Sequence, residues 1–112
     1  MIKTIKDLLE SYNIPVPEDV PETLLNYVIN EEGMESYGDY HTEKQGDRTV
    51  HVFSTLNDVP DIAYPLKIEN ILDLDKESAT WSEIRTWEGS GERSAGVSKT
   101  IYADGTVIDG MT

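Results

Sequence analysis

The amino-acid sequence predicts an α+β fold, in which two short N-terminal helices pack on an antiparallel sheet of four to five strands. Apolar residues recur at helical spacing up to about residue 32, and from residue 34 onward they alternate with polar residues, as in strands. The strand-like segments are separated only by turn residues, which favours an antiparallel meander. A chain of 112 residues has the usual length of one domain, so residues 1–112 are predicted to form a single acidic α+β domain.

The first predicted helix begins after Thr4, a residue type that can cap a helix N-terminus. One face of this helix carries its apolar residues: Ile5, Leu8, Leu9 and Tyr12. Asn13 and the following Pro15 are expected to end it, because proline cannot continue a helix.

The second predicted helix begins at Pro21 and runs to about Glu32, with Gly33 as the first residue beyond its end. Its apolar residues again form one face: Leu24, Leu25, Val28 and Ile29. Two carboxylates, Glu31 and Glu32, would then stand at a helix C-terminus, where the helix dipole favours a cation.

A β-hairpin is predicted from residues 37–42 and 48–55, with Gly46 at positive φ in the turn between them. Pairing of Thr42 with Arg48 would set its register. This register places three pairs opposite each other: Tyr40 with Val50, Asp39 with His51, and Tyr37 with Phe53.

Two longer strands are predicted next. Residues 66–74 alternate apolar and charged side chains, although Asn70 interrupts the apolar face. Residues 79–88 carry Trp81 and Trp87 on one side with two charged residues between them, and at least one tryptophan is expected in the core.

The last predicted hairpin joins residues 97–103 to residues 106–109 through the Asp-Gly dipeptide at 104–105, which is typical of tight β-turns. The Gly-rich segment 89–96 is expected to form a mobile loop between two strands. Residues 57–65, which contain two prolines, are expected to form the longest irregular connection.

No residue pattern predicts catalysis. The absence of cysteine excludes thiol nucleophiles and thiolate metal sites. Asp39 and His51 form an acid-base candidate across the first hairpin, but no nucleophile accompanies them. The acids at 73–77 could bind a divalent cation through their carboxylate oxygens. The EF-hand pattern fails, however, because Ser78 stands where it needs glycine and Ile84 where it needs glutamate. Solvated acids at the end of a strand are therefore favoured. We therefore expect a protein that is not an enzyme, with no catalytic residue, no metal ligand and no cofactor.

The charge balance favours a basic protein as the partner. The formal net charge is -13, from 22 acids and 9 bases, which opposes direct binding to nucleic acid or to an anionic membrane. The N-terminal residues include no uninterrupted apolar run, so neither a signal peptide nor a membrane span is predicted. A cytoplasmic location is the default expectation for such a cysteine-free chain.

Residues 7–43, called the acidic stretch below, contain ten acids and no Lys or Arg, whereas even mixing would place about three bases there. Glu31 and Glu32 at the predicted helix end would oppose the dipole by roughly 0.3–1 kcal/mol each, so local stability does not explain them. The predicted partner-binding residues are five acids of the stretch and two tyrosines: Glu31, Glu32, Glu35, Tyr37, Asp39, Tyr40 and Glu43.

Carboxylates on a small rigid domain can imitate the phosphates that a nucleic-acid-binding groove recognises. In size, acidity and lack of a catalytic motif, the chain resembles by functional analogy the small acidic inhibitors that phages and plasmids encode against host nucleases. These include anti-restriction, anti-CRISPR and glycosylase-inhibitor proteins, although no motif of theirs aligns with this sequence. We expect an inhibitor with a DNA-mimic-like surface and a nucleic-acid-binding enzyme as its partner. Two alternatives remain: an immunity protein against a basic toxin nuclease, and a soluble acidic module without a charged partner.

Overall fold

The computed structural model describes residues 1–35, 37–57, 66–87 and 93–111. Two helices come first, α1 (Ile5–Ser11) and α2 (Glu22–Leu25). Six strands follow: β1 (Asp39–Gln45), β2 (Arg48–Asn57), β3 (Leu66–Leu74), β4 (Ser78–Trp87), β5 (Arg93–Tyr102) and β6 (Val107–Met111). The predicted α+β class is confirmed, but the single antiparallel sheet has six strands in place of four to five.

Helix α1 is held at both ends by short-range hydrogen bonds. Asp7 N donates to Thr4 Oγ1 at 3.1 Å, and Thr4 N donates to the Asp7 carboxylate at 3.1 Å, which together form a capping box. At the other end Asn13 has a φ of 57°, and Ile14 N donates to Leu9 O at 2.8 Å, as in a Schellman motif. The helix therefore stops where its sequence predicts.

Helix α2 ends at Leu25, well before its predicted end. Residues 27–34 instead run beside residues 2–5, which they meet through isolated β-bridges and backbone hydrogen bonds. One of these bonds joins Ile5 N to Tyr27 O at 3.2 Å, and it satisfies an N–H group that the first turn of α1 leaves open. Residues 27–34 therefore pair with the N-terminal residues and do not form the two further turns predicted for α2.

Glu31 and Glu32 consequently do not lie at a helix C-terminus, and the expected conflict with a helix dipole is wrong. They belong to a turn in which the Asn30 side-chain oxygen accepts hydrogen bonds from Glu32 N at 3.0 Å and from Gly33 N at 3.1 Å. Gly33 does adopt a positive φ of 80°, but it closes this turn rather than a helix.

The β1–β2 hairpin turns at Gly46, which has a φ of 67° as predicted. Its turn is shorter than predicted, because Gln45 already pairs with Arg48. The observed register forms these pairs: Tyr40 with Phe53, Thr42 with His51, and Asp39 with Ser54. The predicted pairs are therefore wrong: Tyr40 with Val50, Asp39 with His51, and Tyr37 with Phe53. This register places the side chains of Tyr40 and Phe53 together on the core face.

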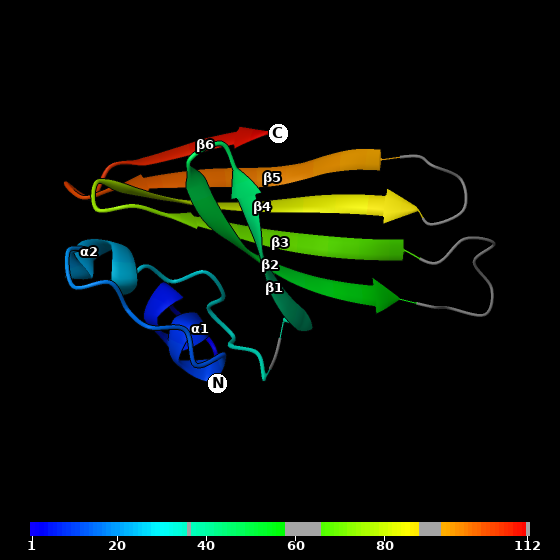
Figure 1. The fold of residues 1–112 in the computed structure, drawn as a ribbon, viewed down its shortest axis with the longest axis horizontal. Helices are drawn as coiled ribbons and strands as arrows, with labels where there is room; N and C mark the ends of the chain where they lie inside the picture. Colours follow the sequence, from blue (N-terminus) through cyan, green and yellow to red (C-terminus); the bar gives the residue numbers. More distant parts are fainter. Residues whose placement is uncertain (36, 58–65, 88–92, 112) are drawn as a thin grey trace.

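The six strands lie in the order of the sequence, each antiparallel to the next. In Figure 1 the β1–β2 turn is seen across β4 and β5, so β1 and the start of β2 bend out of the plane of the other strands. Val50 and Val52 alternate with Phe53 and point to the opposite side of the sheet, yet both are fully buried. Strand β2 therefore buries side chains on both faces.

The main core lies between the helices and one face of the sheet. Its largest fully buried members are Ile2, Ile5, Leu8, Leu9, Leu24, Phe53, Leu72 and Ile101. Figure 1 shows both helices at the end of the sheet where β3 turns into β4. The helices therefore cover one end of this face, and residues 27–35 run along it.

The β5–β6 hairpin forms around the Asp-Gly dipeptide as predicted, with Gly105 at a φ of 93°. The predicted loop at 89–96 is partly wrong, because residues 93–96 belong to β5, while residues 89–92 lie outside the described part of the chain. The predicted irregular connection 57–65 also lies outside it, apart from Asn57 at the end of β2.

Candidate functional site

A groove lies between the wall segment, residues 27–35, 37 and 38, and the sheet face that carries the core. It has a larger part of about 640 Å³ and a smaller part of about 200 Å³, which share four lining residues: Ile29, Asn70, Trp81 and Glu83. The larger part is also lined by Met34, Tyr37, Thr55 and Ile68, and the smaller part by Lys99. Cavities of this size and mixed lining are typical of binding sites.

Asn70 and Trp81 form the shared floor of the groove. The Asn70 side chain interrupts the apolar face of β3 and makes no hydrogen bond with any residue that the structure describes. The Trp81 ring packs edge-on against Tyr37, with ring centroids 5.5 Å apart, and is only half-buried. The expectation that at least one tryptophan contributes to the core is confirmed at Trp81, which also packs against the core cluster.

The charged groups on the sheet side of the groove are paired with opposite charges. Glu83 accepts a hydrogen bond from Arg85 Nε at 2.6 Å. Lys99 Nζ lies 3.9 Å from a carboxylate oxygen of Asp109. The sheet side of the groove is therefore close to electrically neutral.

The acids predicted to bind a partner are all on the surface. Glu31, Glu32, Glu35, Asp39 and Glu43 are exposed, and the first three lie on the segment that walls the groove. The Glu43 carboxylate lies 2.9 Å from His41 Nε2. Within the described part of the chain, the other four carboxylates form no ion pair.

The two tyrosines predicted to act as surface anchors are instead largely inside the protein. Tyr37 is only 9% exposed and belongs to the core. The Tyr40 ring stacks on Phe53 with centroids 5.2 Å apart and also contacts Tyr12. Burial raises the pKa of both phenols, Tyr37 and Tyr40. Their first role is therefore packing, because the hairpin register turns the Tyr40 ring toward the core and the Tyr37 ring packs against Trp81.

His51 is half-buried beside Tyr40. It does not pair across the hairpin with Asp39, because Asp39 pairs with Ser54. Its Nδ1 lies 2.8 Å from the Tyr40 hydroxyl, in hydrogen-bond contact. Burial lowers the pKa of His51 below its ordinary value of 6.5, against the opposing effect of the Asp73 carboxylate. The acid-base pair considered from the sequence is therefore not assembled, and the imidazole serves as a neutral packing group.

This lowered pKa makes folding stability depend on pH. The unfolded chain binds the His51 proton more tightly than the folded one, so stability is complete above about pH 6.5 and is lost as the pH falls toward the folded-state pKa. We expect the free energy of unfolding to decrease in this window, by at most about 1.4 kcal/mol per pH unit. Urea denaturation across this range measures the slope. His51→Gln should remove it and His41→Gln should keep it, and an unchanged slope in His51→Gln would contradict the assignment.

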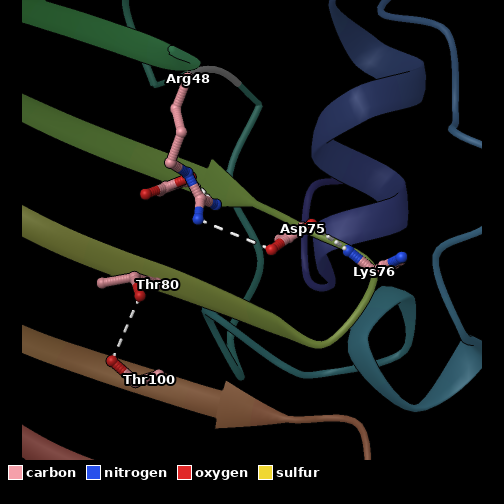
Figure 2. A network of polar contacts seen from close by, with 6 residues as sticks. Arg48, Asp75, Lys76, Thr80 and Thr100 are labelled. Carbon is pink, nitrogen blue, oxygen red and sulfur yellow. Dashed lines mark hydrogen bonds and ion pairs between the residues drawn. The ribbon is translucent and has the colours of Figure 1, made fainter. Parts of the chain in front are cut away.

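The acids at the end of β3 are held by an arginine from β2. Arg48 forms ion pairs with Asp73 and Asp75, and Figure 2 shows its side chain reaching toward Asp75. On the neighbouring strands, the Thr80 and Thr100 hydroxyls lie 3.2 Å apart (Figure 2). The described residues contain no group of three or more potential metal ligands. The ion pairs of these acids with Arg48 therefore link the start of β2 to the end of β3.

The acids and tyrosines of the predicted site are thus divided between surface and core, and the groove beside them was not anticipated. One sequence signal pointed to it, namely the polar Asn70 within an apolar strand face.

Comparisons with protein-family models, with curated proteins and with solved structures found no match to this chain. Among the described residues, no helix is both long and apolar enough to cross a membrane.

Proposed function

We propose that this protein is a non-enzymatic inhibitor whose acidic stretch occupies the basic nucleic-acid-binding site of a partner enzyme. The observation that carries the proposal is a set of eight exposed carboxylates that form no ion pair with any described residue: Glu10, Glu18, Asp19, Glu22, Glu31, Glu32, Glu35 and Asp39. A surface optimised only for its own stability would intersperse bases among these acids.

The physical basis is electrostatic complementarity. Fixed carboxylates beside one another create a negative potential that steers a basic protein toward them and replaces the phosphates it ordinarily contacts. The backbone under several of these acids is held in place: residues 27–34, which include Glu31 and Glu32, pair with the N-terminus, and α1, which includes Glu10, is capped at both ends. A backbone held in this way loses little further conformational entropy on binding.

The proposal is tested with two variants that remove the same charge from different surfaces. In the first, Glu31, Glu32 and Glu35 become Gln; in the control, Asp47→Asn, Glu69→Gln and Glu77→Gln remove three acids outside the acidic stretch. Partners are captured from bacterial lysate on the immobilised protein and identified by mass spectrometry. The captured enzyme is then titrated against each variant.

We expect a basic nucleic-acid-binding enzyme that is released by high salt and by duplex DNA. The first variant should bind it roughly tenfold more weakly, because exposed ion pairs contribute about 0.2–1 kcal/mol each. The control should change affinity by less than about twofold. Equal losses in both variants would show that the acidic stretch has no special role, and a complex insensitive to DNA would show that the nucleic-acid-binding site is not occupied; either result would contradict the proposal.

A further inference from the structure

We propose that the groove receives an extended segment of the basic partner, in which one large apolar side chain lies between lysine or arginine residues. The inference rests on the proposed function, because it names the part of the partner that meets the wall segment. Three features of the groove carry it: an amide without an internal partner, an apolar recess, and carboxylates on one rim.

The amide is that of Asn70, on the floor of both parts of the groove. An asparagine side chain donates two hydrogen bonds and accepts two, so it can bind the C=O and the N–H of one extended peptide unit at the same time. No described residue uses these groups. Asn70 is only partly buried, so its amide is open to the groove and can exchange water for a peptide backbone.

The recess is formed by Ile29, Met34, Ile68 and Trp81. Met34 is 41% exposed, and the flexible methionine side chain adapts to differently shaped apolar partners. Trp81 adds a large ring that is supported from one side by Tyr37 and half-open to solvent. An apolar side chain that entered here would bury its surface against these groups, as anchor residues do at protein interfaces.

The charge of the rim comes from the wall segment. Asn30, Met34 and Tyr37 line the groove, and Glu31, Glu32 and Glu35 lie between them in sequence, exposed and without an ion pair to any described residue. Across the groove, Glu83 and Lys99 already have partners of opposite charge. Cations on either side of the apolar anchor would therefore lie close to the segment that carries these three exposed carboxylates, and opposite a surface whose charges are balanced.

The test uses acetylated and amidated synthetic peptides with a central Leu, Met, Phe or Trp between Lys and Arg residues. Each is compared with the same peptide carrying Ser at the centre and with one carrying Gln in place of the bases. Affinities are measured by calorimetry. Binding is located by ¹⁵N NMR, in which the Asn70 side-chain amide and the Trp81 indole N–H give separate signals. We expect the best apolar-centred peptide to shift both signals and to bind at least tenfold more tightly than either control peptide.

Two variants test whether the groove binds the peptide, and neither changes the charge of the groove. Asn70→Ala removes the free amide, and Met34→Ala shortens an exposed wall residue; Val107→Ala is the matched control, since Val107 is 42% exposed and lies outside the groove lining. We expect peptide affinity to fall about tenfold with Asn70→Ala and severalfold with Met34→Ala, and to stay the same with Val107→Ala.

Failure of this inference is distinguishable from failure of the proposed function. If the intact partner enzyme loses affinity for the Glu31, Glu32 and Glu35 variant but not for Asn70→Ala or Met34→Ala, the acidic surface binds without the groove and the inference is overturned. If no peptide shifts the Asn70 and Trp81 signals, it is overturned as well. Loss of peptide binding in both groove variants, with the control unchanged, supports it.

Discussion

Replacing Gly38 by alanine is expected to lower the free energy of unfolding by about 3 kcal/mol or more, through positive-φ strain and a steric clash. Gly38 has a φ of 97°, a conformation that alanine adopts only with strain. An added Cβ would clash with the Ser54 carbonyl oxygen and with Thr55 Oγ1. Neither contact is tolerable, so the chain would have to move at the entry to β1.

Such a movement would break a set of hydrogen bonds that lock this entry. The Tyr12 hydroxyl donates to Gly38 O at 2.7 Å and accepts from Tyr37 N at 3.0 Å. Thr55 Oγ1 donates to Tyr37 O at 3.0 Å. These bonds join α1, the wall segment and β2 at one point, so strain at Gly38 is transmitted to all three elements.

Gly46→Ala is the matched control, because Gly46 also has a positive φ but has no atom within 4 Å of an added Cβ. It should cost only about 1 kcal/mol, the strain of a left-handed alanine. Urea denaturation of both variants measures the difference. Equal losses for the two glycines would show that the close approach of residues 38 and 54 does not exist in solution.

Phe53→Ala is expected to destabilise the fold by about 3–5 kcal/mol, the usual cost of truncating a fully buried aromatic residue. Phe53 is 0% exposed and touches three other rings, with centroid distances of 4.9 Å to Tyr12, 5.2 Å to Tyr40 and 6.3 Å to Trp81. Alanine would leave a cavity between α1 and the sheet that these rings cannot collapse to fill.

Because a small domain has roughly 5–15 kcal/mol of stability in total, Phe53→Ala would populate the unfolded state measurably. Phe53→Leu retains most of the apolar volume and should lose clearly less, which keeps the comparison measurable if the alanine variant is insoluble. Denaturant titrations by tryptophan fluorescence give both values. A loss below about 1 kcal/mol for Phe53→Ala would contradict a core built around this ring.

The local signals in the sequence were sufficient where a few neighbouring residues decide the outcome. Thr4 and Asn13 delimit α1, Gly46 and Gly105 take the positive φ that their turns require, and residues 66–74 form a strand over their full length. In each case the competing conformations differ by interactions within one turn or one strand, which periodicity and turn chemistry report directly.

The same reasoning failed where distant residues compete. Residues 26–32 have a helical apolar pattern, but pairing with residues 2–5 satisfies backbone groups that a longer α2 would leave unpaired at the start of α1. The β1–β2 register was wrong because a two-residue turn, and not the longer one inferred, brings Tyr40 onto Phe53. Neither competition is visible within a local window of sequence.

For the candidate site, the sequence alone determined the charge: an acidic stretch without a single base, whose carboxylates are on the surface because ionised groups are costly to bury. It also marked Asn70 as a polar residue in an apolar strand face. Only the tertiary structure decided that Tyr37 and Tyr40 pack inward and that residues 27–35, 37 and 38 form one wall of a groove over Asn70 and Trp81. Charge is a property of each residue, whereas burial and cavities depend on which distant segments meet.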